Sequence, residues 1–500
     1  MGKILIVGID SLDPHVLLKY KEKLPNISNM IEESPTFISK SVFPVDTIPA
    51  WMSVYTGLHP GNHGILYAYD VFDPNLSDLK KLDISHIKGQ TFWDYAGQNG
   101  YKSVIVFPQL MYPTWDINGI MVSKSPIDNR VDWMKTEICI DCFPESIKGK
   151  HKIPDKLENL WGGFPGNDNL MQWANIGKSV VCRETSIGMK LCKDEKWDLF
   201  FIYYNLLDII QHRLWRFFDE NDPSYPGKTS LKGIILDYYI LFDRVIGDFM
   251  KTFPDASLIV MSDHGHKSRP INTVNLNECL RANKHLELNK KNTLVINIIK
   301  KVILKTANKF KLEHFLIKLV TKNKNMTKMS KSIYSSVSLI DLSKSDAHLS
   351  NFAGIKSYPH GGIEINKDRV SDVEFEKIRE ELISELSSLK LNGMPLFKWI
   401  TKNDDLYPGK FNKKIYPDIV FELRDGYGVG WDLNSSLYGK AYDHNVASGG
   451  HAKDATFLIK NINKTVTKNE LNLVDVAPSI LDMLNINWRV FNFDGNSIFE

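Results

Sequence analysis

The chain has 500 residues, of which 43% are hydrophobic and 24% charged, an ordinary composition for a soluble globular protein with more than one small core. Its formal net charge of +3 is too small to indicate a nucleic-acid polymer as a partner. Five cysteines, an odd number, favour free thiols in a reducing compartment, and Cys139-x-x-Cys142 without a second pair is interpreted as two ordinary thiols. No apolar run reaches the ~20 residues that span a bilayer, so we expect a cytoplasmic protein.

The first half of the chain alternates between short apolar runs and helical patterns. The runs typical of buried strands are residues 4–9, 103–107, 199–204 and 257–261, and the helical patterns are residues 91–98 and 234–252. This alternation predicts an α/β fold with a mainly parallel sheet and helices on both faces.

The second half changes character. Residues 282–331 are rich in lysine, carry only two acidic residues and repeat apolar positions, a pattern that predicts basic amphipathic helices. Further on, the sequence predicts a helix at 373–389, a strand at 455–460 and a helix that opens at Asp475-Val476-Ala477-Pro478. We expect one core from residues 1–270 and 440–500, and an inserted cap from residues 271–439.

Six Asp and His residues stand near the ends of predicted elements: Asp10, Asp208, His212, Asp263, His264 and His451. Open α/β sheets bind ligands beyond the carboxyl ends of their strands, and Asp and His are common ligands of transition metals. The spacing from Asp208 to His212 places both on one face of a helical turn. His451 follows two glycines, and we expect a flexible loop to bring it to the others. Taken singly, each of these residues is more often structural, as a cap, a turn or a satisfied histidine.

Thr47 lies in Phe43-Pro44-Val45-Asp46-Thr47-Ile48-Pro49-Ala50-Trp51, where Pro49 indicates a turn into a helix. A hydroxyl near a helix N-terminus faces free backbone N–H groups, which suit a phosphate. The structural alternative is an N-cap threonine.

The order of these motifs resembles the type I phosphodiesterase/nucleotide pyrophosphatase group of the alkaline phosphatase superfamily. The resemblance covers most of the chain and rests on Gly8-Ile9-Asp10, Thr47-Ile48-Pro49-Ala50-Trp51, Thr56-Gly57, Pro60-Gly61-Asn62-His63-Gly64-Ile65, Asp208-x-x-x-His212, Ser262-Asp263-His264-Gly265 and Gly450-His451.

The resemblance implies an alkaline-phosphatase-like core that holds two divalent metal ions, usually zinc, although manganese also suits these ligands. One ion would be held by Asp10, Asp263 and His264, with Thr47 bridging or adjacent. The other would be held by Asp208, His212 and His451. Thr47 would attack a small phosphate-ester substrate to form a phospho-threonine, which water then hydrolyses, so that phosphodiester or pyrophosphate bonds are cleaved.

One departure from the family pattern concerns the substrate. Nucleotide pyrophosphatases of this group carry an Asn that donates to a phosphoryl oxygen, and the matching position here is Ala68. Tyr67, Tyr69 and Lys124 are alternative donors. Phosphomonoesterase, phosphonate hydrolase and phosphoryl transferase activities therefore stay open, as does an inactive lipid- or partner-binding relative. The sequence around Thr47 does not match sulfatases, and it fits phosphoglycerate mutases less well.

The lysine-rich segment, residues 284–331, allows three interpretations. It can be a solvated cationic face, an electrostatic funnel for anionic substrates, or a peripheral contact with an anionic membrane.

Overall fold

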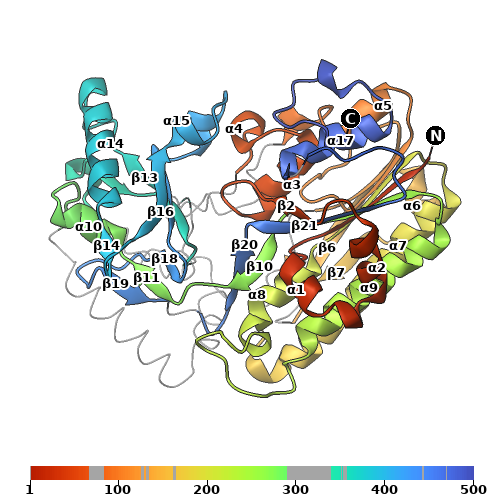
Figure 1. Cartoon of the computed structure of the whole chain (residues 1–500), viewed down its shortest axis with the longest axis horizontal. Coiled ribbons are helices and arrows are strands. Elements are labelled where there is room, and N and C mark those ends of the chain that lie inside the picture. The colour runs from red at the N-terminus through yellow and green to blue at the C-terminus, as the bar shows by residue number, and fades with distance from the viewer. Residues whose placement is uncertain are drawn as a thin grey trace. The chain divides into compact units, whose positions relative to one another are not determined.

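The computed structural model describes residues 2–66, 84–125, 129–130, 134–160, 165–289, 339–350, 352, 357–441, 444–468 and 470–499. The chain forms two compact units, shown in Figure 1. The first unit comprises Met1–Ile65, Leu82–Lys267 and Gly449–Glu500, and the second comprises Leu66–Lys81 and Ser268–Ser448. Each unit has its own hydrophobic core.

The first unit is built on one large sheet with the strand order β22-β2-β21-β9-β1-β8-β3-β4-β6-β5, and β7 pairs with β6. The five central strands, from β9 to β4, run parallel, whereas β21 and β6 join them antiparallel. The strands are β1 (Ile4–Ile9), β2 (Ile38–Lys40), β3 (Ser103–Val106), β4 (Gly119–Lys124), β5 (Asn129–Arg130), β6 (Thr136–Phe143), β7 (Lys156–Asn159), β8 (Leu199–Tyr204), β9 (Ser257–Met261), β21 (Asp454–Lys460) and β22 (Leu471–Asn472). The predicted α/β class with a mainly parallel sheet is confirmed.

Helices cover both faces of this sheet because the central strands are apolar on both sides. Along β1, Leu5, Val7 and Ile9 join the core under α2, α7, α8 and α9, while Gly8 points to the other face and packs on Trp51 of α3. The helices are α1 (Pro14–Lys19), α2 (Pro25–Glu33), α3 (Thr47–Thr56), α4 (Pro60–His63), α5 (Phe92–Gln98), α6 (Ser146–His151), α7 (Leu170–Asp194), α8 (Leu206–Phe218), α9 (Ile234–Thr252) and α17 (Val476–Met483).

The register of the central strands brings three chain segments to one edge of the sheet. Ile9 of β1 pairs with Tyr204 of β8, and Gly8 pairs with Met261 of β9. The backbone N–H of Asp10 then donates to the carbonyl of Tyr204 at 2.9 Å. Residues that follow β1, β8 and β9 therefore leave the sheet at its carboxyl edge, where ligands bind in open α/β sheets.

The second unit contains an antiparallel sheet in the order β12-β13-β17-β16 and a small sheet in the order β18-β11-β19. Its elements are β11 (Asn272–Val274), α10 (Leu276–Ala282), β12 (Ala347–Leu349), β13 (His360–Ile365), α14 (Asp372–Ser387), β14 (Lys390–Leu391), β15 (Met394–Pro395), β16 (Phe397–Lys402), α15 (Asn403–Leu406), α16 (Asn412–Ile415), β17 (Ile419–Leu423), β18 (Tyr427–Val429) and β19 (Tyr438–Lys440). The helix predicted at 373–389 is confirmed as α14.

The lysine-rich segment falls mainly outside the described residues. Helix α10 ends at Ala282 and residues 283–289 are not helical, so the first residues of the predicted basic helices are not part of one. Residues 290–338 lie outside the described part, as do Tyr67, Ala68 and Tyr69. In the ranges that the structure describes, no helix is long and apolar enough to cross a membrane.

All five cysteines are free. Cys139 and Cys142 lie on β6, where buried and partly exposed residues alternate, and their spacing of three puts the two side chains on opposite faces of the strand. They cannot form a redox pair without a change of register, which supports their interpretation as two ordinary thiols.

Gly8 provides a test of how β1 supports α3. A Cβ at Gly8 would lie 2.7 Å from Cη2 of the fully buried Trp51. Gly8→Ala should therefore lower the free energy of unfolding by about 1–3 kcal/mol, measured by urea denaturation. Gly149→Ala on α6 is the matched control, since nothing lies within 4 Å of its added Cβ and alanine favours a helix. Equal loss of stability in both variants would contradict the packing.

Candidate metal centre

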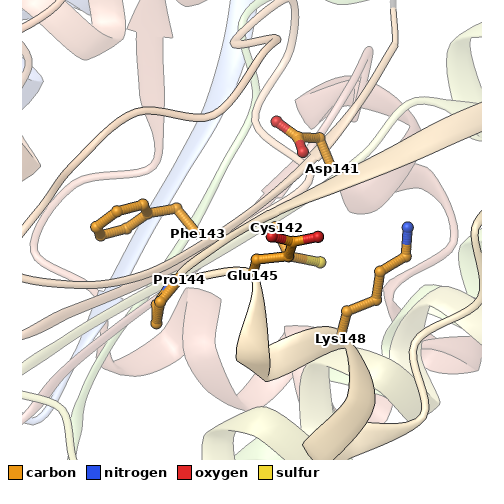
Figure 2. Close-up of a pocket in the computed structure, with 6 residues that line it drawn as sticks. All are labelled: Asp141, Cys142, Phe143, Pro144, Glu145 and Lys148. Atoms are coloured by element: carbon orange, nitrogen blue, oxygen red, sulfur yellow. The ribbon is translucent and has the colours of Figure 1, made fainter.

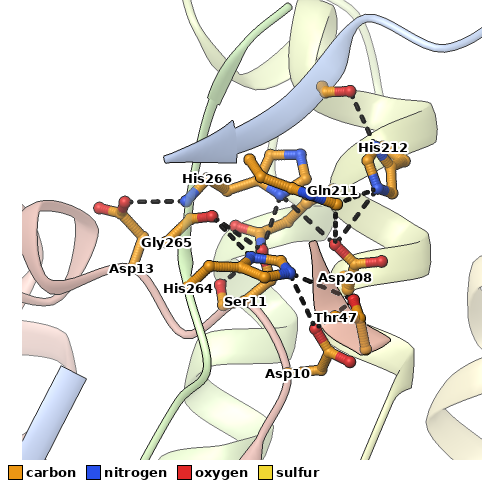
Figure 3. A network of polar contacts seen from close by, with 12 residues as sticks. Asp10, Ser11, Asp13, Thr47, Asp208, Gln211, His212, His264, Gly265 and His266 are labelled. Atoms are coloured by element: carbon orange, nitrogen blue, oxygen red, sulfur yellow. Dashed lines mark hydrogen bonds and ion pairs between the residues drawn. The ribbon is translucent and has the colours of Figure 1, made fainter. Parts of the chain in front are cut away.

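The seven residues predicted from the sequence come together at the carboxyl edge of the first unit's sheet, and Figure 3 shows several of them. They are Asp10 after β1, Thr47 at the start of α3, Asp208 and His212 on α8, Asp263 and His264 after β9, and His451 on β20 (Gly449–Ala452). The seven residues therefore converge at one edge of the sheet, as predicted.

The first group consists of Asp10, Asp263 and His264. Their potential ligand atoms lie within 4.8 Å of one another. His264 Nε2 is 3.3 Å from Asp263 Oδ2 and 3.5 Å from Asp10 Oδ1. Thr47 Oγ1 lies 3.2 Å from His264 Nε2 and 3.5 Å from Asp10 Oδ1. The threonine hydroxyl is thus adjacent to this group, as the sequence predicted.

The second group consists of Asp208, His212 and His451. His212 Nε2 is 3.3 Å from Asp208 Oδ1 and 3.0 Å from His451 Nε2, and His451 Nε2 is 3.6 Å from Asp208 Oδ1. His264 also lies within reach of Asp208 and His451, and its ring stacks on that of His451 at 3.9 Å. We assign His264 to the first group, because its nearest carboxylate oxygen there is 3.3 Å away and His212 already completes the second.

Backbone carbonyls fix the orientation of all three imidazoles. The Nδ1 atoms of His212, His264 and His451 face the carbonyls of Gly449 at 2.8 Å, Gly265 at 3.0 Å and Val45 at 2.8 Å. A ring whose Nδ1 donates to a carbonyl keeps Nε2 for a metal ion, and all three Nε2 atoms are directed to the centre. This arrangement is typical of histidines that bind metal ions.

Lone pairs from both groups converge on the centre. The Nε2 atoms of His212 and His451 lie only 3.0 Å apart, close enough for both to bind one ion. Asp208 Oδ1 and Asp263 Oδ2 are buried and accept no hydrogen bond from any described residue. A cation between these lone pairs would satisfy them all, and three imidazoles with three carboxylates match the ligand preferences of zinc and manganese.

The three carboxylates differ in their pKa values. Burial, followed by repulsion from Asp263 and Asp208, raises the pKa of Asp10 well above its usual range. Burial also raises the pKa of Asp263 to about 6. For Asp208, burial acts in the same direction, but attraction to His212, His451 and His264 outweighs it and holds the pKa well below its usual range. The centre is a crowded anionic site that a proton or a cation must neutralise.

The environment of His451 differs from the prediction. His451 lies on β20, which pairs with β10 (Gly265–Ser268), and not in a flexible loop. The glycine is needed for close packing: a Cβ at Gly449 would lie 2.2 Å from His266 Nε2 and 2.4 Å from the Gln211 carbonyl oxygen. Gly449 can therefore approach α8 closely enough for its own carbonyl to accept from His212.

Thr47 is the first residue of α3, and the N-cap is Asp46, whose carboxylate accepts from the N–H of Ile48 at 3.3 Å. The alternative of Thr47 as an N-cap is therefore wrong, and its hydroxyl is directed to Asp10 and His264. The helix is anchored by Trp51, whose ring packs edge-on against Tyr203 at 4.9 Å.

The sequence did not predict a role for four residues around the centre: Ser11, Tyr203, Gln211 and His266. Tyr203 donates to Asp10 Oδ2 at 2.5 Å and so leaves Oδ1 to face the centre. The one sequence signal for His266 is that it is a second histidine in Asp263-His264-Gly265-His266. Nothing in the sequence distinguishes Ser11 or Gln211 from ordinary core residues.

Other predicted residues have structural roles. His63 of the Pro60–Ile65 motif is buried, and burial lowers its pKa to about 3. Its Nδ1 accepts from the N–H of Ile65 and its Nε2 faces Ser53 Oγ at 3.2 Å, which ties α4 to α3. Lys124, a possible phosphoryl donor, instead forms a buried ion pair with Glu184 at 2.8 Å.

A surface pocket of about 430 Å³ in the first unit is lined by Asp141, Cys142, Phe143, Pro144, Glu145 and Lys148 (Figure 2). Asp141 accepts from Thr114, Lys148 pairs with Asp155, and burial raises the pKa of the Cys142 thiol to about 11. A protonated thiol among paired charges is a poor nucleophile, and we assign this pocket no chemistry.

The raised pKa of Asp263 makes the metal-free protein sensitive to pH. Between pH 4 and 6 the folded state keeps a proton that the unfolded state has lost, so stability falls as pH rises, by roughly 3 kcal/mol in all. A bound cation would replace this proton. Zinc should therefore raise the melting temperature of chelator-stripped protein more at pH 7 than at pH 5, measured by calorimetry.

Asp263→Asn is the control, since its amide does not titrate. The variant should lose most of the zinc stabilisation and its dependence on pH. Equal stabilisation of the wild type at both pH values would show that Asp263 is not a site of metal–proton competition.

Comparisons with known proteins agree with this architecture. Residues 4–450 match the family model described as type I phosphodiesterase/nucleotide pyrophosphatase. A search of curated protein sequences gave no match. Among solved structures, human ectonucleotide pyrophosphatase/phosphodiesterase 5 is 15% identical, covers 100% of both chains and has a TM-score of 0.50. Phosphonoacetate hydrolase from Sinorhizobium meliloti 1021, solved with phosphonoacetate, is 14% identical, covers 95% of this chain and 94% of its own, and has a TM-score of 0.53.

At these sequence identities the two solved structures show only a common fold. The assignment of this chain to a family depends on the family model. Its match extends over the strands and helices that bring Asp10, Thr47, Asp208 and Asp263 together, and ends one residue before His451. The chain belongs to the type I phosphodiesterase/nucleotide pyrophosphatase family of hydrolytic enzymes, within the alkaline phosphatase superfamily.

Proposed function

We propose that this chain is a two-metal-dependent hydrolase of phosphodiester or pyrophosphate bonds in small phosphate esters, with Thr47 as the nucleophile. The observation that carries the proposal is the position of the Thr47 hydroxyl, within 3.5 Å of both Asp10 and His264 and beside two groups of metal-ligand type. Zinc is the expected ion and manganese is compatible.

The two groups have separate tasks in this proposal. Asp10, Asp263 and His264 would hold one ion next to Thr47, and Asp208, His212 and His451 would hold the other. When bound, such ions polarise a phosphoryl group and lower the pKa of a hydroxyl beside them. The donor set fits this role because its lone pairs converge and its Nδ1 hydrogens are already used.

The side chain of Thr47 makes and breaks the bonds. Its Oγ1 attacks phosphorus while the bond from phosphorus to the leaving oxygen breaks, and a phospho-threonine results. The proton that Oγ1 loses passes to water, because the nearby atoms His264 Nε2 and Asp10 Oδ1 would be occupied by the ion. Water then attacks phosphorus and releases the phosphate and the free hydroxyl. The first turn of α3 adds little to phosphate binding, because the N–H of Ile48 donates to the Asp46 carboxylate, Pro49 has no N–H, and the N–H of Ala50 donates to the Asp46 carbonyl.

Phosphonates and phosphomonoesters form the second group of candidate substrates. Ala68 stands where nucleotide-cleaving relatives are expected to carry a donor Asn, which disfavours a nucleotide. The Sinorhizobium protein of similar fold was solved with a phosphonate. Turnover of bis-p-nitrophenyl phosphate, p-nitrophenyl phosphate and phosphonoacetate by the same preparation separates diester, monoester and phosphonate preferences.

Two proposals, on the location of the enzyme and on its contact with membranes, rest on the sequence alone. We place it in the cytoplasm and propose that residues 284–331 contact anionic membranes, on the basis of their lysine content. Sedimentation with acidic and neutral vesicles tests this contact, and equal binding to both would exclude it.

Thr47→Ala tests the nucleophile. The variant should lose turnover by on the order of 10⁴-fold or more, because no other described hydroxyl occupies this position. Its zinc content, measured by atomic absorption, should stay at the wild-type level because the carboxylates and imidazoles remain. Thr47→Ser keeps a hydroxyl and should retain measurable activity. Full activity of Thr47→Ala would exclude Thr47 as the nucleophile.

A further inference from the structure

Ser11, directly after Asp10, has an unusual backbone. It is fully buried and adopts a left-handed conformation, with φ at 62°, although it is not a glycine. A non-glycine residue in this region costs about 1 kcal/mol or more. Strain of this kind persists only where the surrounding structure enforces it, and it gathers at functional sites.

The polar atoms of Ser11 contact Gln211 of α8 and the residues that follow β9 (Figure 3). Its N–H donates to Asp263 Oδ1 at 3.2 Å, and its carbonyl accepts from Gln211 Nε2 at 2.8 Å. Its hydroxyl lies 2.7 Å from His266 Nδ1 and 3.3 Å from the Gly265 carbonyl. The left-handed turn is what aims these groups in different directions.

These contacts join three of the four segments that carry ligand-type residues, namely the ends of β1 and β9 and helix α8. Ser11 itself continues from Asp10. Asp263 is held through Oδ1, which leaves Oδ2 to face the centre. Gln211 precedes His212 on α8, and its Oε1 accepts from Tyr239, so the side chain is fixed at both ends. Ser11 is thus a common support for residues of both groups.

His266 extends this support towards the second group. Its N–H donates to Asp13 Oδ2 at 2.9 Å, and its ring packs against those of His212 at 4.9 Å and Trp215 at 5.0 Å. Its Nδ1 lies 2.7 Å from Ser11 Oγ and 3.7 Å from Asp208 Oδ1. The ring therefore fills the space between Ser11 and the ligand-type residues of α8.

Packing alone does not explain why a histidine is buried at position 266, because its imidazole carries a free-energy cost. Its Nε2 is buried and has no hydrogen-bond partner in the described part of the chain. An unsatisfied buried polar atom costs about 1–3 kcal/mol, which an apolar ring of similar size would avoid. The feature that an apolar ring could not reproduce is the hydrogen bond between Nδ1 and the Ser11 hydroxyl.

We propose that Ser11 and His266 are positioning residues that couple the two halves of the metal centre, an inference that rests on the proposed function. Ser11 orients Asp263 through its N–H and holds His266 through its hydroxyl. His266 in turn supports Asp208 and His212 from behind. Neither residue binds an ion, but together they set the distance between the two groups of ligands.

Substitution at His266 separates this role from packing. Asn places an amide where Nδ1 lies and can keep the bond to Ser11, whereas Phe keeps the ring volume and loses the bond. Ser11→Ala removes the hydroxyl and leaves the backbone unchanged. Ser103→Ala is the matched control, because Ser103 is also fully buried and its hydroxyl has no partner among the described residues.

The experiment measures zinc stoichiometry and affinity by competition with a chelator, together with the melting temperature of the metal-free proteins. Ser11→Ala and His266→Phe should weaken zinc binding about 10- to 100-fold, the range expected for supports of metal ligands. His266→Asn should bind close to the wild type, and Ser103→Ala should match it. The metal-free melting temperatures show that weaker binding does not reflect unfolding.

The possible failures are distinguishable. A wild-type chain that binds no divalent ion would overturn the proposed metal centre and this inference with it. Two equivalents of zinc in the wild type, with unchanged affinity in Ser11→Ala and His266→Phe, would overturn the coupling alone. Equal weakening in His266→Asn and His266→Phe would also overturn it, because ring packing would then explain the effect.

Discussion

Three carboxylates buried at one edge of an apolar sheet set the constraint on which the centre depends. Asp10, Asp208 and Asp263 are at most 4% exposed, and each faces at least one other. An ionised carboxylate away from water costs several kcal/mol unless it is paired. Asp208 is paired with imidazoles, whereas Asp10 and Asp263 respond with raised pKa values. Cation binding and folding stability are therefore coupled through the same residues.

Backbone atoms, more than side chains, bring the ligand-type residues together and orient them. Parallel register ends β1, β8 and β9 at one edge, so residues that are hundreds of positions apart become neighbours. Backbone carbonyls then orient the three imidazoles, and the N–H of Ser11 orients Asp263. Backbone groups have fixed positions once the sheet forms. They therefore hold the metal-ligand side chains in place before any ion binds.

The sequence predicted the parts of this centre that follow from periodicity. Asp10, Asp208 and Asp263 were recognisable because each follows a continuous apolar run, and His212 because of its i+4 spacing on a helix. The antiparallel direction of β21 and β6 was not predictable, since apolar content says nothing of strand direction. Gly449 suggested flexibility but serves close packing, a difference that the positions of His266 and the Gln211 carbonyl explain. Ser11 gave no signal, because its left-handed backbone results from its neighbours and not from its own chemistry.

The centre also bears on the alternative of an inactive relative. Three features at this one site lower stability: two carboxyl groups buried with raised pKa values, Ser11 in a left-handed conformation, and the unsatisfied Nε2 of His266. Proteins that lose a function can replace such groups with well-packed apolar residues at no cost in stability, and often with a gain. A binding surface elsewhere on the molecule would need none of them. These three unfavourable features surround a hydroxyl directed at the centre. Such a concentration of locally unfavourable structure is typical of a catalytic site, and it favours an active hydrolase.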